Sequence, residues 1–542
     1  MEDIPTDVES ACSLQSLLPY MVSNLPVVYR NATSSCHWTL CGNSLEKLAE
    51  LQLVPVDIPQ IAPSTSYTTD RYGVHTRVLM TYNEFLKRAH TGNECIYLRD
   101  WHIDHVPDVS KQYHVPEAFQ DDWLNWYWQR IQVLHRQAKD VPLDDYSFCY
   151  VGTPGSFTGT HHDVCLSYSW SANITGIKRW NLWAPEDAFA LFTSDESGVH
   201  VNAPKVPSFS SDPIGQYLQH LNSESIVSDT RPGHYDPKLY PHLSSCRRKT
   251  IIQYPGDIVF VPSGWFHNVE NMPFPDSFSA PLILPQTDTS CFAQDTDATL
   301  LTISINRNWF NSFNLQSVVA FILREWINMQ WELKHLLSKS DRVILHAAYD
   351  IEQSEALYAE EVENAMLMDA SSWHAHGEVI LLANAAINLR MLMELLATRL
   401  AMLQMVSYDI LDENIRKAFA CTEEGMWLSI FSDRFSFQEH YILDDADRKL
   451  AVLQHSTYMP NVTQTVWEVQ MIKLAQAIEL LADTPGVVSA LGYIYETALD
   501  DKLGVEVGST PEPPITCRMA REHVVRCALV DMTKVAKGLV YP

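Results

Sequence analysis

The stretch GTHHDV at residues 159–164 places two histidines and an aspartate in direct succession. On a β-strand, residues i and i+2 point to the same face, and residue i+1 points to the opposite face. His161 and Asp163 can therefore share a face that His162 cannot join. This spacing predicts that His161 and Asp163 are metal ligands. The alternative is a histidine hydrogen-bonded to a carboxylate without metal, because an H-x-D pair alone often arises by chance.

A third ligand is expected on a later strand, in GDIVFVPSGWFHNVEN (256–271). A Gly-Asp turn precedes an apolar run that is typical of a buried strand, and Pro262-Ser263-Gly264 ends it. His267 then falls at the rim of a barrel. Two histidines and one carboxylate are the ligand set of non-haem Fe(II) oxygenases, which leave positions open for a co-substrate and O₂. His161, Asp163 and His267 together predict such an Fe(II) site.

Residues 93–310 have mainly β character. Short runs rich in aromatic and β-branched residues are bounded by Gly, Pro, Asn and Asp, which indicates strands. They are NECIYLRDWHI (93–103), YSFCYVG (146–152), SYSWSANITG (167–176), IKRWNLWAP (177–185), TIIQYPGDIVFVPSGW (250–265) and TLLTISINRNW (299–309). A helix is expected over 121–139. Two polar insertions, about 194–248 and about 272–298, read as long loops, the first with a short helix at IGQYLQHL.

After about residue 315 the apolar residues recur at three- and four-residue spacing, which predicts helices. The predicted helical stretches are SVVAFILREWINMQWELKHLL (317–337), GEVILLANAAINLRMLMELLATRLAML (377–403) and TVWEVQMIKLAQAIELLA (465–482). Thr465 and Glu468 have the spacing of a capping box. The chain is thus predicted to comprise an N-terminal α/β segment (1–92), a catalytic domain (93–310) and a helical C-terminal region (311–542).

The combination THHDV, GIKRW and GDIVFVPSGWFH resembles the JmjC family of 2-oxoglutarate oxygenases. YLRDWH, SYSWSANITGIKRWNLWAP, VFVPSGWFHNVEN and SINRNWFN bring the sequence closer to the lysyl hydroxylase branch of that family. The resemblance covers roughly residues 93–310. It implies an α+β fold: a double-stranded β-helix (a jelly-roll, cupin-like barrel) with flanking helices and a mainly α-helical C-terminal region. It also implies Fe(II) and 2-oxoglutarate as cofactors, with O₂ as co-substrate.

A site for 2-oxoglutarate needs a cation and hydrogen-bond donors for the buried distal carboxylate. Lys178, Trp180 and Leu182 share one strand face, and the resemblance places the co-substrate lysine at Lys178, against the usual solvated role of a lysine. It also places a carboxylate-binding hydroxyl at Thr158. Tyr97 is a further donor by looser analogy, with a core tyrosine as the alternative. In TISINRN (302–308) polar side chains alternate with isoleucines, and Asn306 is the expected neighbour of the co-substrate.

The resemblance further implies a protein lysyl hydroxylase that acts on the translation termination factor. A JmjC histone lysine demethylase would use the same chemistry, but the sequence carries no Cys/His-rich reader module. A non-catalytic cupin-like interaction module is the third reading. The simultaneous presence of all three ligands and Lys178 disfavours it.

The composition restricts the partners of this chain of 542 residues. A formal net charge of −28 disfavours nucleic acid and anionic membranes, which bind clustered Lys and Arg, and is compatible with a basic protein partner. No apolar run is long enough to span a bilayer. The 11 scattered cysteines and the acidic start MEDIPTDVESAC favour a cytoplasmic location, with the nucleus as an alternative. The C-terminal helices are candidates for a homodimer interface.

Overall fold

The structure is a computed structural model. It describes residues 2–59 (apart from 5 and 10), 75–91, 95–135, 146–193, 226–273, 301–333, 368–410, 460–495 (apart from 485) and 515–540, with the single residues 336 and 499. Most of both predicted insertions, including IGQYLQHL, lies outside the described residues. These residues divide into two compact units, one ending at Phe310 and the other beginning at Asn311.

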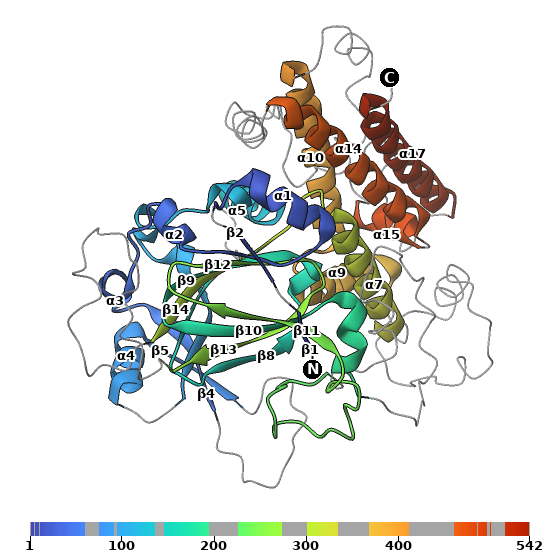
Figure 1. Cartoon of the computed structure of the whole chain (residues 1–542). Helices are drawn as coiled ribbons and strands as arrows, with labels where there is room; N and C mark the ends of the chain where they lie inside the picture. The colour runs from blue at the N-terminus through green and yellow to red at the C-terminus, as the bar shows by residue number, and fades with distance from the viewer. Residues whose placement is uncertain are drawn as a thin grey trace. The chain divides into compact units, whose positions relative to one another are not determined.

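The first unit contains two β-sheets (Figure 1). The five-stranded sheet has the order β1 (Glu2–Ile4), β11 (Arg247–Gln253), β10 (Ile177–Trp183), β13 (Phe266–Met272), β8 (Phe157–His161). The nine-stranded sheet has the order β2 (Asp7–Glu9), β3 (Val27–Tyr29), β12 (Ile258–Val261), β9 (Tyr168–Thr175), β14 (Thr302–Trp309), β7 (Ser147–Gly152), β6 (Tyr97–His102), β4 (Leu53–Pro59), β5 (His75–Thr81). From β8 to β14 the chain alternates between the sheets, with β10 and β11 as one hairpin within the smaller sheet. This alternation is that of a jelly roll.

An apolar cluster joins the inner faces of the two sheets. Trp180 and Leu182 on β10 pack with Val259 and Val261 on β12, as the two-residue strand period requires. The other members of the cluster are Val28, Ile251, Trp265 and Val269. Burying these side chains between the sheets is the main favourable term that holds the barrel closed. The predicted jelly-roll fold with flanking helices and a helical C-terminal region is confirmed.

Helices of the first unit flank the barrel. They are α1 (Leu14–Ser23), α2 (Ala32–Ser35), α3 (Gly42–Ala49), α4 (Tyr82–Thr91) and α5 (Trp123–His135). The helix predicted over 121–139 is α5. Its fully buried Trp123 and Tyr127 agree with the apolar pattern of that stretch. Residues 1–92 contribute five strands to the two sheets, so this segment is part of the barrel structure as well as its support.

The first insertion ends where β11 begins. Arg247 and Arg248 already belong to β11, where they pair with β1. After the bridge between Phe192 and Ile226, the chain returns beside β8, and the Ser228 carbonyl accepts a hydrogen bond from the Thr160 N–H at 2.8 Å. Ser228 of this insertion therefore lies beside the edge strand that carries His161.

The second unit is helical in the residues that the structure describes. Its long helices are α7 (Leu315–Leu333), α9 (Ala370–Ala385), α10 (Leu389–Ile410), α14 (Pro460–Asp483), α15 (Val487–Ile494) and α17 (Ile515–Val540). The continuous stretch predicted over 377–403 is wrong, because Ala386 adopts a left-handed conformation with φ 65° and separates α9 from α10. The side chain of Asn388 then caps α10 by accepting from the Met391 N–H at 2.9 Å.

Two further details of the helical unit differ from the sequence prediction. The capping box at Thr465 and Glu468 is wrong, because α14 already begins at Pro460 and Thr465 lies inside it. The tail from residue 515 forms α17, a helix for which no bounds were predicted within the helical region 311–542. Its buried residues Val525, Ala528, Leu529, Met532 and Ala536 do follow helical spacing.

Within the described ranges, no single helix is long and apolar enough to cross a membrane. Two bent pairs, α9 with α10 and α14 with α15, pass a test of length and composition when their halves are taken together.

The turn between β9 and β10 tests the packing of the barrel. Gly176 has φ 77°, and an added Cβ would lie 2.6 Å from the Cα of Thr302 on β14. We expect Gly176→Ala to lower the free energy of unfolding by about 2–4 kcal/mol, through backbone strain together with this clash. Gly155→Ala is the matched control, because Gly155 has φ 87° and no atom within 4 Å of its Cβ position. Urea unfolding should show the larger loss for Gly176→Ala. Equal losses would contradict the packing argument.

Candidate metal centre

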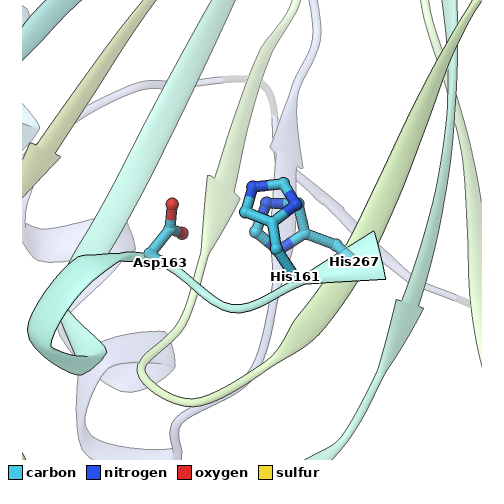
Figure 2. Close-up of side chains that lie close together, drawn as sticks. All are labelled: His161, Asp163 and His267. Carbon is cyan, nitrogen blue, oxygen red and sulfur yellow. The ribbon is translucent and has the colours of Figure 1, made fainter. Parts of the chain in front are cut away.

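Three residues named by the sequence analysis converge at one end of the barrel. One ligand atom from each of His161, Asp163 and His267 lies within 4.8 Å of the other two. The rings of His161 and His267 have centroids 4.3 Å apart, because these residues are paired across β8 and β13 (Figure 2). Among the described residues, this is the one group of three or more His, Cys, Asp or Glu side chains with such spacing.

Asp163 reaches the site by a different route from the predicted one. β8 ends at His161, and Asp163 lies in the connection that follows. The prediction that His161 and Asp163 share a strand face is therefore wrong, because Asp163 is not on a strand. The prediction that their side chains lie together is confirmed. His162 stays outside the group: its Nδ1 lies 2.8 Å from the Asp163 carbonyl oxygen, and its ring stands edge-on to Phe266 with centroids 5.3 Å apart.

The backbone fixes the tautomers of the two histidines. Nδ1 of His161 lies 2.8 Å from the Gly159 carbonyl oxygen, and Nδ1 of His267 lies 3.2 Å from the Trp265 carbonyl oxygen. A carbonyl oxygen only accepts, so each Nδ1 carries the proton and each Nε2 keeps its lone pair for a metal. Burial, reinforced by His267, lowers the pKa of His161 to about 4, so that imidazole is neutral at neutral pH.

Lys178 lies inside the barrel. Its side chain is only 2% exposed, and its Nζ donates to the Ser304 Oγ at 2.5 Å. No carboxylate forms an ion pair with it among the described residues. Burial lowers the pKa of Lys178 to about 7, since desolvation disfavours the ammonium form. An anion entering from outside the protein would supply the missing countercharge.

The other residues predicted to bind the co-substrate lie on neighbouring strands. The Thr158 Oγ1 lies 3.4 Å from the hydroxyl of Tyr97, to which it donates. The ring of Tyr150 links this pair to Lys178, with its centroid 6.1 Å from that of Tyr97 and 5.8 Å from the lysine Nζ. These contacts bring Lys178, Thr158 and Tyr97 into one polar region.

Asn306 has a different neighbour. It lies on β14 between Ser304 and Asn308, and its Oδ1 accepts from the Ser171 Oγ at 2.8 Å. Ser304, two residues earlier, is the β14 residue that contacts Lys178. The role of Asn306 as a co-substrate neighbour stays a prediction.

Asn271 lies beside Lys178 and was not among the residues predicted from the sequence. Asn271 on β13 is paired with Lys178, is 1% exposed and donates to the Ser156 Oγ at 2.7 Å. Gly152 leaves room for this contact, because a Cβ there would clash with both the Asn271 Nδ2 and the Ser156 Oγ. Counting by two from His267 along β13 leads to Asn271, so the strand period contained the signal that identifies it.

Comparison with known proteins gives a family match. A family model described as "Cupin-like domain" matches residues 17–315. The 2-oxoglutarate and iron-dependent oxygenase JMJD4 of Danio rerio is 29% identical over 308 residues, which are 54% of this chain and 58% of the relative. JMJD4 of Homo sapiens is 30% identical over 260 residues, 47% of each chain. The arginine-specific demethylase JMJ20 of Arabidopsis thaliana is 27% identical over 266 residues, 48% of this chain and 45% of the relative. In each case the chain covers less than two thirds of the relative.

The buried lysine makes the stability of the unliganded protein depend on pH. The pKa of Lys178 is about 7 in the folded protein, against the ordinary lysine value of 10.5 expected in an unfolded chain. Between these two pH values the unfolded chain binds more protons, so the free energy of unfolding rises with pH, and the full penalty applies below the lower value. Lys178→Met should raise stability at and below neutral pH by a few kcal/mol, at about 1.4 kcal/mol per pKa unit, and should remove this rise.

Thermal unfolding of the protein without added ligands, measured across that pH range, tests the expectation. Lys111→Met is the matched control, because the Lys111 side chain is 74% exposed. A pH dependence that Lys178→Met leaves unchanged would contradict the assignment of a buried, destabilising ammonium group.

Proposed function

This chain belongs to the cupin-like domain family, and from that premise we propose that it is an Fe(II)- and 2-oxoglutarate-dependent protein hydroxylase. The observation that carries the proposal is the convergence of His161, Asp163 and His267. The donor set fits Fe(II), because two imidazoles with free Nε2 lone pairs and one carboxylate make up the facial triad of non-haem iron oxygenases. The names of the JMJD4 relatives support the same cofactors.

Lys178, Tyr97 and Thr158 would hold the distal carboxylate of 2-oxoglutarate. Lys178 supplies a cation in a region from which water is largely excluded, where a charge-assisted hydrogen bond is strong. When bound, iron with 2-oxoglutarate and O₂ supplies the oxidation of an unactivated C–H bond, coupled to decarboxylation of 2-oxoglutarate to succinate. The residues of this chain bind and orient the co-substrate and shield it from solvent.

We further propose a lysine in the translation termination factor as the substrate. The motifs that resemble the lysyl hydroxylase branch support this choice, and the net charge of −28 favours a basic partner. The second candidate activity is demethylation, which the name of the Arabidopsis thaliana relative favours. Hydroxylation and demethylation begin with the same oxidation of a C–H bond, so the products must distinguish them.

The two adjacent histidines allow a matched test of the metal site. His161→Ala should reduce Fe(II)-dependent succinate formation to background, because it removes an imidazole from the converging group. His162→Ala should retain most of it, since the His162 ring packs against Phe266 outside that group. Succinate release is measured for both variants after circular dichroism has shown that they are folded. Activity in His161→Ala together with loss in His162→Ala would reverse the assignment.

Mass spectrometry tests the substrate. Incubation with Fe(II), 2-oxoglutarate and O₂ should add one oxygen to an unmodified lysine of the termination factor, in proportion to succinate released. The parallel incubation uses methylated histone peptides, carrying methyl-lysine or methyl-arginine. Formaldehyde from those peptides without oxygen addition to the termination factor would support the demethylase instead. Bound iron with succinate but neither product would leave the oxygenase in place and refute both substrates.

A further inference from the structure

We propose that Asn308 and Ser169 are positioning residues that fix the carboxylate of Asp163 for metal binding, an inference that rests on the proposed function. The Asn308 Nδ2 donates to Asp163 Oδ1 at 2.8 Å, and the Ser169 Oγ donates to Asp163 Oδ2 at 2.7 Å. Both oxygens of this carboxylate are therefore engaged by side chains. Asn308 and Ser169 are direct cross-strand partners on β14 and β9, so one register position of the nine-stranded sheet provides both donors.

The two hydrogen bonds matter for Asp163 because this residue lies outside the strands, where no strand pairing fixes its backbone. In the connection after Asp163, Cys165 has φ 44° and Leu166 has φ 54°, two consecutive left-handed residues that are neither glycine nor asparagine. Such backbone persists only where its surroundings determine it. Here the Ser263 Oγ donates to the Leu166 carbonyl at 2.6 Å, and the Ser167 N–H donates to the Val164 carbonyl at 2.9 Å. The backbone is anchored beyond Asp163, and the two donors orient its side chain.

Asn308 is itself held in place. Its N–H donates to the Tyr146 carbonyl at 2.9 Å, and its carbonyl accepts from the Asn125 Nδ2 at 2.8 Å. The Oδ1 of the same Asn125 accepts from the Tyr146 N–H at 2.9 Å. Asn125, which is 0% exposed, thus takes the place of a direct hydrogen bond between Tyr146 N–H and the Asn308 carbonyl, just before β7 begins. These hydrogen bonds from Asn125 on α5 hold the backbone of Asn308, and so fix the position from which its side chain extends.

The two donors have a chemical consequence for metal binding. Each carboxylate oxygen offers more than one lone-pair direction, and each donor occupies one of them. The plane of the carboxylate is then set before any metal arrives, and less rotational freedom is lost on binding. Partners of metal ligands that act in this way typically change metal affinity by about 10- to 100-fold when they are removed. A residue that served only the fold would change stability and leave the affinity of the folded protein unaltered.

The test measures Mn(II) binding to the full chain, because Mn(II) takes similar ligands and is stable in air. The electron paramagnetic resonance signal of free Mn(II) gives the dissociation constant without turnover. We expect Asn308→Leu and Ser169→Ala each to weaken Mn(II) binding by about 10- to 100-fold, and the double variant to weaken it further. Ser169→Thr, which keeps the hydroxyl, should bind within about threefold of the wild type on the same scale.

Ser171→Ala is the matched control for the loss of a hydroxyl. Ser171 lies two residues from Ser169 on β9, and its Oγ donates to Asn306 instead of Asp163. Its Mn(II) affinity should equal that of the wild type, while thermal unfolding reports any loss of stability in every variant. Unchanged Mn(II) affinity in folded Asn308→Leu and Ser169→Ala would overturn the positioning role alone. A wild-type protein that binds no Mn(II) or Fe(II) would overturn the proposed function and this inference with it.

Discussion

The metal site depends on the hydrogen bonds to the carboxylate of Asp163, because they connect this residue, which follows a strand of one sheet, to the other sheet. His161 and His267 lie on adjacent strands of the five-stranded sheet, where pairing holds their rings together. Asp163 lies on the connection that leaves this sheet for β9, and its hydrogen bonds come from Ser169 and Asn308 of the nine-stranded sheet. The distance from Asp163 to the two histidines is therefore set by the distance between the two sheets. The apolar cluster around Trp180, packed between these sheets, maintains that distance.

Lys178 lowers the stability of the barrel locally, because its amine is buried. A buried ammonium group without a carboxylate partner destabilises the fold, and the same desolvation lowers the pKa of Lys178. The rings of Trp180 and Tyr150 flank the amine, with centroids 5.7 and 5.8 Å from its Nζ. Such an arrangement is unfavourable for the empty protein and favourable once an anion enters, which is typical of a binding site and atypical of a structural lysine.

Lys178 and His267 could be predicted from the sequence because they follow the two-residue strand period, whereas Asp163 lies beyond the end of β8. That period placed Lys178, Trp180 and Leu182 on one face, and burial of all three agrees with it. Contacts that depend on register between distant strands could not be predicted. Asn306 and Asn308 look equivalent along the chain, yet the pairing of β14 with β9 gives Ser171 to one and Ser169 to the other. Ala386 illustrates a second limit, because no glycine or proline marks the left-handed residue that ends α9.

The charges of the site explain why its two halves belong together. Asp163 places a carboxylate beside His267, near one end of β13, and Lys178 pairs with Asn271, near the other end of that strand. A divalent cation bound at the first end and a dicarboxylate bridging to the second would leave the interior electrically neutral. Either one alone would leave a net charge in a region of low dielectric, where an uncompensated charge is costly. Each component would therefore favour binding of the other through electrostatics.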